Sequence, residues 1–287
     1  MLKTSIGIFD SGLGGLSVMK AIRKELPGEN LIYFGDCQYA PYGDRSQAFI
    51  TNRVLAITDF LMNQRIKALV FACNTATMMS IAEVRKRLKI PVIGIEPAIK
   101  PAIKESQTGC IGVMATTRTI QSSRFSWLIE QFVQKGSRVI PQACPGLADA
   151  VESGQNNEPH TKELIKKYTL PFIENHCDRI VLGCTHYPFL TDQILEVFPP
   201  ETVKLIDPSD AVARQLKRRL IEIQGLSSNS VGSESFWISG LTDRTKVAVE
   251  QLWGTPIVVQ NANIFSVLEN LPNQVSSNGR SFDSNPF

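Results

Sequence analysis

The fold of this chain is decided by the stretch Lys67-Ala-Leu-Val-Phe-Ala-Cys-Asn-Thr-Ala76 and by its counterpart, Asp178-Arg-Ile-Val-Leu-Gly-Cys-Thr-His-Tyr187. In each stretch a short apolar run ends at a small residue, and a cysteine and polar side chains follow. Such a run predicts a buried strand, and the polar residues predict the start of the next segment. The two halves of the chain therefore place Cys73 and Cys184 at equivalent strand ends.

Other motifs repeat in the same order. Ile95-Glu-Pro97 and Ile206-Asp-Pro208 lie 111 residues apart, as do the two cysteines, and Ile6–Ser11 resembles Ile111–Thr116. Each half alternates short apolar runs with helical patterns, which favours βα units and a parallel sheet. We therefore predict an internally duplicated α/β chain, with its functional groups at the carboxyl ends of the strands.

The repeats also suggest domain boundaries. Residues 1–97 and 209–265 are expected to form a first α/β domain, and residues 98–208 a second. The tail over residues 272–287 is rich in Ser, Asn and Pro and has little to bury, so we expect it to be disordered.

Three segments near the C-terminus are expected to return to the first domain: a strand near 236–239, a helix near 243–253 and a strand near 256–259. In the second half, the apolar pattern predicts a helix over about 120–134.

Composition excludes several classes of protein. The chain has 287 residues, of which 43% are hydrophobic and 20% charged, as in soluble globular proteins. A net charge of +3 is too small to indicate a nucleic-acid partner. No apolar run approaches the ~20 residues that cross a bilayer, and the first strand begins by Ile6, which leaves no room for a secretory signal. We therefore expect a cytoplasmic protein without a membrane partner.

The six cysteines are expected to be free thiols, as is usual in the cytoplasm. They include no C-x2-C pair, so the spacing argues against a zinc site and no metal is expected. The same spacing, with the cysteines in separate halves, weakens the alternative of a thiol redox protein.

Cys73 and Cys184 are the strongest candidates for catalysis. Two acid/base groups that face each other across one carbon atom are what inversion of configuration requires. An ordinary thiol, with a pKa of ~8.5, is a poor base at neutral pH. Both cysteines are predicted at strand-to-helix junctions, where the helix dipole favours the thiolate. The alternative for either one is a buried structural cysteine.

Three other side chains could assist the thiols. Asp10 follows the first strand and could help to deprotonate Cys73, or it could simply cap the next helix. His186, two residues after Cys184, could exchange a proton with that thiol. Glu152 could support the same thiol, although an isolated glutamate at a helix end is more often solvated.

A small ligand could be held by further polar groups at the predicted strand ends. The run Gly12-Leu-Gly-Gly15 lacks the full dinucleotide-binding pattern, and it predicts a tight turn whose N–H groups suit a small anion such as a carboxylate. Tyr42 and Gly43 belong to a loop that could close over the ligand. The remaining hydroxyl and amide groups, which individually could be helix caps, indicate a ligand with carboxylate and ammonium groups: Ser11, Asn74, Thr75, Thr116, Thr119 and Thr185.

At these motifs the chain resembles the glutamate racemases of the cofactor-independent aspartate/glutamate racemase superfamily. The resemblance spans roughly residues 6–260. The matching segments are Phe9–Leu16, Tyr33–Asp36, Pro41–Gly43, Ala72–Ala76, Val92–Pro97, Val151–Gly154, Leu182–Pro188 and Phe236–Gly240.

The resemblance implies two pseudo-symmetric α/β domains, each with a mainly parallel sheet flanked by helices, and an active site in the cleft between them. It implies interconversion of L- and D-glutamate without pyridoxal phosphate, metal or nucleotide, in a protein that is often a homodimer. D-glutamate then feeds peptidoglycan synthesis, and through it cell-wall biogenesis and cell shape.

Residue roles follow from the same resemblance. Cys73 and Cys184 would be the two proton-transfer bases, with Asp10 assisting Cys73, and Glu152 and His186 assisting Cys184. Substrate contacts are implied for Asp10, Ser11, Tyr42, Gly43, Asn74, Thr75, Thr116, Thr185 and His186.

One position departs from the family pattern. Arg118 stands where a small residue is common, and this puts the role of Thr119 in doubt. Two alternatives to a glutamate racemase stay open from the residues alone: a racemase of aspartate or another acidic amino acid, and a non-catalytic protein that binds such an amino acid.

Overall fold

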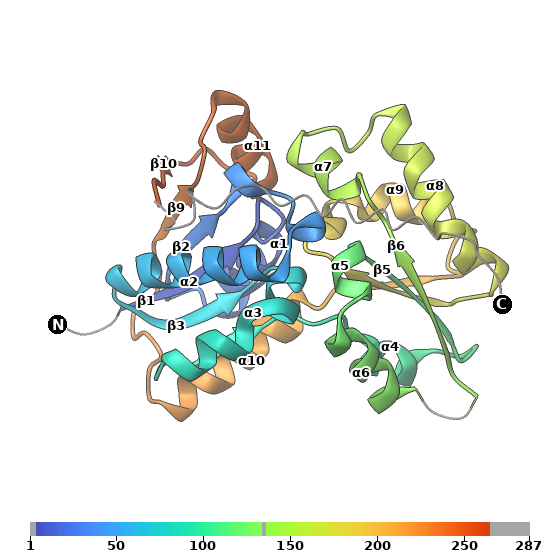
Figure 1. Cartoon of the computed structure of the whole chain (residues 1–287), viewed down its shortest axis with the longest axis horizontal. Coiled ribbons are helices and arrows are strands. Elements are labelled where there is room, and N and C mark those ends of the chain that lie inside the picture. The colour runs from blue at the N-terminus through green and yellow to red at the C-terminus, as the bar shows by residue number, and fades with distance from the viewer. Residues whose placement is uncertain (1–3, 134–135, 265–287) are drawn as a thin grey trace, which may run out of the picture.

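The structure is a computed structural model, and it describes residues 4–133 and 136–264 (Figure 1). The predicted tail over residues 272–287 lies outside the described residues. Two parallel sheets, one in each half of the molecule, are flanked by helices (Figure 1).

The first sheet has six strands in the order β10-β9-β2-β1-β3-β4, and each neighbouring pair is parallel. Its strands are β1 (Ser5–Asp10), β2 (Asn30–Gly35), β3 (Ile66–Phe71), β4 (Val92–Gly94), β9 (Glu234–Ile238) and β10 (Val259–Asn261). Because β9 pairs with β2, the end of the described chain returns to the first sheet, as predicted.

The second sheet has four parallel strands in the order β6-β5-β7-β8. Its strands are β5 (Cys110–Ala115), β6 (Arg138–Ala143), β7 (Arg179–Gly183) and β8 (Lys204–Ile206). This order repeats the β2-β1-β3-β4 order of the first sheet, with β1 equivalent to β5 and β3 equivalent to β7. The predicted α/β fold with two pseudo-symmetric parallel sheets is confirmed.

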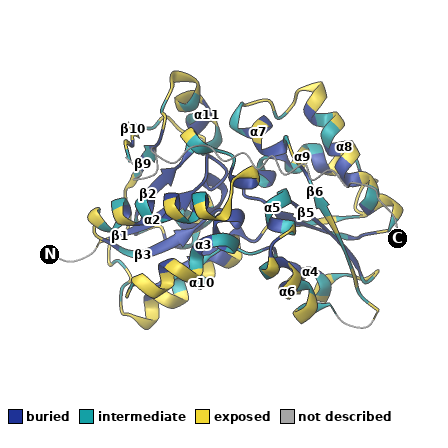
Figure 2. Ribbon diagram, in the orientation of Figure 1, coloured by how far each residue is buried: buried dark blue, intermediate teal, exposed yellow. Residues whose placement is uncertain are grey.

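Helices cover both faces of each sheet, so the central strands are buried from both sides and read as continuous apolar runs (Figure 2). Those of the first half are α1 (Leu16–Glu25), α2 (Gln47–Asn63), α3 (Asn74–Arg87), α10 (Ser209–Glu222) and α11 (Asp243–Trp253). Those of the second half are α4 (Ile99–Glu105), α5 (Thr117–Ile120), α6 (Ser123–Phe132), α7 (Leu147–Glu152), α8 (Pro159–Glu174) and α9 (Thr191–Leu195). Short 3-10 turns are η1 (Cys37–Tyr39), η2 (Tyr42–Asp44) and η3 (Tyr187–Leu190).

The side chains of β1 point alternately to the two faces of the sheet and so belong to two hydrophobic cores. Ile6 and Ile8 pack with α1 and α10 on one face of the sheet, whereas Phe9 packs on the opposite face. On α10 the buried stripe of Val212 and Leu216 packs in the same core as α1, and its spacing is that of an amphipathic helix.

The helix predicted over about 120–134 is present as α6, which begins at Ser123, three residues later than predicted. The hydroxyl of Ser122 accepts a hydrogen bond from the N–H of Phe125 at 3.1 Å, so Ser122 caps a new helix and separates α5 from α6. Within the described residues, no helix has the length and apolar character needed to span a membrane.

Candidate active site

The carboxyl ends of the two sheets face each other and enclose one small pocket, whose volume is about 10 Å³. Asp10 is the last residue of β1, Cys73 follows β3 by two residues, and Cys184 follows β7 directly. Both domains contribute to the pocket wall, which is lined by Ser11, Pro41, Tyr42, Gly43, Cys73, Asn74, Thr75, Thr116, Ala148, Cys184, Thr185 and His186. The structure thus brings together ten of the predicted site residues, while Asp10, Glu152 and Thr119 lie behind this wall.

Cys73 is the N-cap residue of α3, as its sequence context predicts. Its sulfur accepts a hydrogen bond from the N–H of Ala76 at 3.4 Å, and its thiol donates to Oγ of Ser11 at 3.4 Å. Burial, reinforced by the carboxylate of Asp10, nevertheless raises the pKa of the Cys73 thiol to about 12. The expectation that the helix would favour the thiolate here is therefore wrong, because desolvation outweighs the helix terminus.

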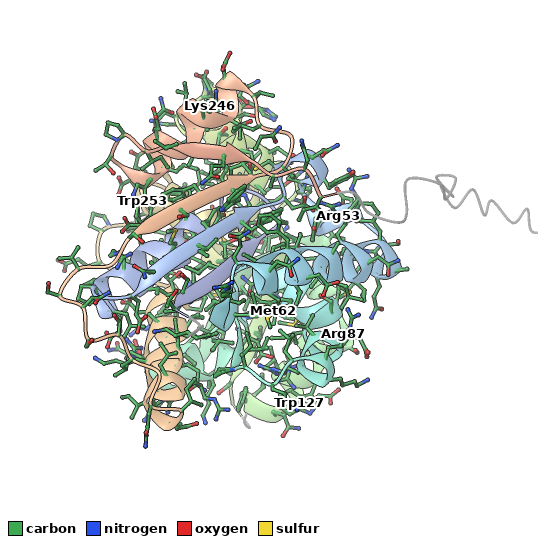
Figure 3. The ribbon with its side chains drawn as sticks, turned by 90° about the vertical axis from the view of Figure 1, so that its left-hand side faces the viewer. Arg53, Met62, Arg87, Trp127, Lys246 and Trp253 are labelled. Carbon is green, nitrogen blue, oxygen red and sulfur yellow. The ribbon has the colours of Figure 1, made fainter. Side chains whose placement is uncertain are left out.

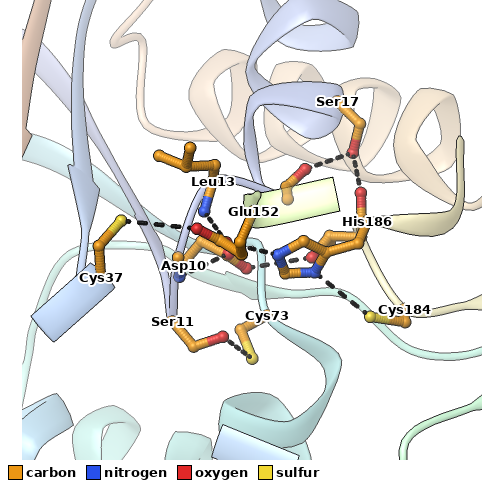
Figure 4. Close-up of polar contacts among 12 residues, drawn as sticks. Asp10, Ser11, Leu13, Ser17, Cys37, Cys73, Glu152, Cys184 and His186 are labelled. Carbon is orange, nitrogen blue, oxygen red and sulfur yellow. Dashed lines mark hydrogen bonds and ion pairs between the residues drawn. The ribbon is translucent and has the colours of Figure 1, made fainter. Parts of the chain in front are cut away.

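Cys184 has a different environment. Its Sγ lies 3.5 Å from Nδ1 of His186, whose Nε2 lies 2.6 Å from Oε1 of Glu152 (Figure 4). Burial alone would lower the pKa of His186, but the neighbouring sulfur and carboxylate outweigh it and hold that pKa well above its usual range. This arrangement favours an imidazolium beside the Cys184 sulfur.

The predicted helix start after Cys184 is wrong. The residues that follow form the 3-10 turn η3, which begins only at Tyr187. A turn of this length has little dipole to offer, so the charge next to this sulfur comes from His186 instead.

Glu152 is held in place rather than solvated. Besides its contact with His186, Oε1 accepts a hydrogen bond from the N–H of Leu13 at 2.5 Å, across the boundary between the two halves (Figure 4). Its Oε2 lies 3.9 Å from the sulfur of Cys37, which donates to it. The alternative of an isolated, solvated glutamate does not hold.

Asp10 is fully buried and does not cap α1, whose N-cap is Gly15 without a side-chain hydrogen bond. Its carboxylate accepts hydrogen bonds from the N–H of Gly12 at 2.9 Å and from the hydroxyl of Thr185 at 3.2 Å. Burial raises the pKa of Asp10, although the charge of His186 and the Gly12 N–H oppose the rise. Among the contacts of the described residues, Cys73 bonds to Ser11 and not to Asp10.

Asn74 and the threonines complete the wall. Asn74 is buried, and within the described part of the chain neither its amide nitrogen nor its amide oxygen has a hydrogen-bond partner. Thr75 joins the two halves, with Oγ1 3.0 Å from that of Thr116 and 3.3 Å from that of Thr119. Arg118 points to the carbonyl of Arg45, at 3.0 Å, and leaves the buried Thr119 in contact with its neighbours.

Comparison with known proteins agrees with this geometry. A family model of Asp/Glu/hydantoin racemases matches residues 6–216. The chain belongs to the Asp/Glu/hydantoin racemase family.

The glutamate racemase of Ectopseudomonas mendocina is 44% identical over 250 residues, which cover 87% of this chain and 94% of that protein. Among solved structures, a glutamate racemase isoform from Bacillus anthracis superposes with a TM-score of 0.84 at 34% identity, over 92% of this chain and 99% of that chain. A glutamate racemase from Francisella tularensis, solved in complex with D-glutamate, superposes with a TM-score of 0.79 at 29% identity, over 92% and 98% of the respective chains. The expectation of an amino-acid racemase is confirmed.

The glycine run of this racemase has a role that its sequence pattern does not indicate. A Cβ at Gly14 would lie 2.5 Å from Nδ1 of His186, and one at Gly12 would collide with the carboxylate of Glu152. The run does present an N–H group to a carboxylate, as its turn predicted, but that carboxylate is the protein's own Glu152. Only a long-range contact could have revealed this, and no local pattern around Glu152 indicates it.

In this racemase, Glu152→Gln is expected to destabilise the fold in a pH-dependent manner. The folded-state pKa of His186 is raised, so its contribution to stability is fully present below the unfolded pKa of ~6.5 and is lost as pH rises through the folded pKa. Without the carboxylate, the free energy of unfolding should fall by about 1 to 3 kcal/mol near pH 6 and by much less near pH 9.

Urea unfolding of both proteins at the two pH values measures this difference. Glu163→Gln on the exposed face of α8 is the matched control, and it should show little change at either pH. A loss of stability for Glu152→Gln that is equal at both pH values would contradict the imidazolium assignment.

Proposed function

We propose that this protein interconverts L- and D-glutamate by a two-base reaction in which Cys73 and Cys184 exchange protons with opposite faces of Cα. The observation that carries the proposal is the pocket itself: the two sulfurs, one from each sheet, line the same small cavity. Two acid/base groups on opposing walls suit inversion at a carbon placed between them.

The two thiols differ in their surroundings. Cys73 is protonated, because burial raises the pKa of its thiol to about 12. Cys184 has a partner in His186, which is backed by Glu152. One direction of the reaction uses Cys184 as the base and Cys73 as the acid, for the enantiomer whose α-hydrogen faces Cys184.

Proton transfer then runs across the pocket. The Cys184 thiolate takes the α-proton and becomes a thiol, and the Cys73 thiol gives its proton to the opposite face and becomes a thiolate. The Ser11 hydroxyl and the Ala76 N–H are close enough to stabilise that thiolate. The other enantiomer reacts by the same steps in reverse.

Removal of the α-proton leaves a carbanion at Cα, which its surroundings must stabilise. In bulk water the α-hydrogen of an amino acid is far too weakly acidic to be removed by a thiolate. A pocket this small leaves little room for water once a substrate is bound, and polar donors aimed at the developing charge act strongly in such a site. The protonated α-ammonium of the substrate places a further positive charge beside that carbon.

Glutamate is favoured as the substrate by the relatives, which are glutamate racemases over nearly their whole length. The unpartnered amide of Asn74 can bind a carboxylate and an ammonium group at once. The other expected substrate contacts that line the pocket are the loop of Tyr42 and Gly43, His186, and the hydroxyls of Ser11, Thr75, Thr116 and Thr185, while Asp10, also expected to contact the substrate, lies behind this wall.

We further propose that residues 1–97 with 209–265 form one domain and residues 98–208 the other. The packing of α10 on α1 and the pairing of β9 with β2 support this division, although residue 265 lies outside the described residues. A homodimer in the cytoplasm that supplies D-glutamate for peptidoglycan belongs to the same proposal and rests on the family.

Circular dichroism of L- and D-glutamate with the purified protein, free of metal and cofactor, tests the function. Each enantiomer should decay to the racemate, and in deuterated water each should gain deuterium at Cα. Aspartate assayed alongside should turn over more slowly. Faster turnover of aspartate would reassign the substrate, and binding of glutamate without any exchange at Cα would identify a binding protein instead.

A further inference from the structure

A buried ionic cluster lies directly behind one wall of the pocket. Asp36, which follows β2, is fully buried, and its carboxylate accepts hydrogen bonds from Nη2 and Nε of Arg53 at 2.7 and 3.0 Å. The same carboxylate accepts from the hydroxyls of Tyr42 at 2.5 Å and Ser239 at 2.8 Å. Arg53 projects from α2 and is itself buried (Figure 3).

The guanidinium of Arg53 contacts three different groups. Nε and Nη2 both donate to the carboxylate of Asp36, and Nη1 donates to the carbonyl of Ile264 at 3.3 Å. Cζ lies over the ring of Tyr39, 4.2 Å from its centroid. A lysine carries the same charge but cannot reproduce this bidentate geometry.

Tyr42 connects this cluster to the pocket. Its hydroxyl is bonded to Asp36 rather than free for a ligand, while the residue and its neighbour Gly43 line the wall. Gly43 also packs across the boundary between the halves, because a Cβ there would lie 3.3 Å from Cβ of Thr116. The position of this loop therefore depends on where Asp36 holds the phenol.

We propose that Arg53 is a positioning residue for substrate binding: through Asp36 it fixes Tyr42, and thereby the 41–43 wall of the pocket. An ion pair that served only stability would have no such connection to the ligand. The pair between Lys67 and Glu29, 2.5 Å apart and also largely buried, is an example, since Lys67 stands at the start of β3 and so at the opposite end of the strand from Cys73.

Arg53→Lys tests the inference, because it keeps the charge and removes the bidentate fork. Its KM for glutamate should rise by about tenfold, the effect of losing one hydrogen bond to a charged group. Its kcat should stay within about twofold of the wild type, since both thiols and His186 are untouched. Tyr42→Phe, which removes the hydroxyl bond to Asp36, should raise KM in the same way.

The double variant shows whether the two residues act together. If Arg53 acts through Tyr42, the effects of Arg53→Lys and Tyr42→Phe on KM should be clearly less than additive. Lys67→Met is the matched control for loss of a buried ion pair, and it should lower the melting temperature without moving KM.

The inference rests on the proposed function, but the two fail separately. Wild-type protein that does not racemise glutamate would refute the function itself. An active wild type with an unchanged KM in Arg53→Lys, or with additive effects in the double variant, would refute only the positioning role. Arg53→Lys could also lower the melting temperature and the active fraction while KM stays unchanged, which is the behaviour expected for Lys67→Met. That result would show that Arg53 only stabilises the fold.

Discussion

Cys184→Ala is expected to abolish racemisation in both directions. Inversion requires a proton donor on one face of Cα and an acceptor on the other, and alanine can be neither. The expected loss of kcat is about a thousandfold, within the range found for removal of a positioned acid/base group. Cys73→Ala should have the same effect, because every turnover uses both sulfurs. Circular dichroism with either enantiomer of glutamate measures the rates.

Two other cysteines provide matched controls. Cys144 and Cys110 are buried in the second half but do not line the pocket. Cys144→Ala and Cys110→Ala should therefore remove a thiol of the same kind and keep kcat within about threefold of the wild type. If Cys73→Ala or Cys184→Ala behaved like these controls, the two-base assignment would be lost.

Gly14→Ala is expected to inactivate the enzyme without unfolding it. The new methyl group would lie 2.5 Å from Nδ1 of His186 and 2.7 Å from Oγ1 of Thr185, so the second half could not settle against the glycine run. Cys184 and its partners would then be displaced from Cys73. A displacement of about 1 Å can cost a hundredfold in rate, and we expect a loss of this order in kcat/KM.

Gly225→Ala is the control for this substitution. Gly225 lies in the loop after α10, and a Cβ there would lie 3.0 Å from the end of the exposed, flexible side chain of Ile223, which can shift by a few tenths of an ångström, and 3.6 Å, an ordinary contact distance, from the backbone oxygen of Leu220. Both variants should keep the wild-type far-ultraviolet spectrum, and only Gly14→Ala should lose activity. Wild-type kcat/KM for Gly14→Ala would show that the close approach to His186 is unnecessary.

Local sequence patterns were sufficient to predict the positions of the two catalytic candidates. The apolar runs before Cys73 and Cys184 specify buried parallel strands, and the carboxyl ends of such strands collect functional groups. The repeated motifs were sufficient to predict an internally duplicated α/β chain, and the strand order of the second sheet does repeat part of the first. Each of these features depends on residues close together in the chain.

Contacts between distant segments were not predictable in this way. The N–H of Leu13 and the carboxylate of Glu152 are 139 positions apart, and neither has a neighbouring residue that indicates the other. The environment of each thiol could not be predicted from the local sequence either. A helix start was expected to favour both thiolates, yet burial raises the pKa of Cys73, and the neighbour of Cys184 is His186 rather than a helix start.

The space between the sulfurs, about 10 Å³, has room for roughly one water molecule, and glutamate is many times larger. We therefore expect the walls of the pocket to move apart before substrate can reach the thiols, and again before product can leave. Every catalytic cycle thus includes an opening of the pocket before substrate binding and another before product release. The rate of this opening step sets an upper limit on kcat, however fast the proton transfer between sulfur and Cα is.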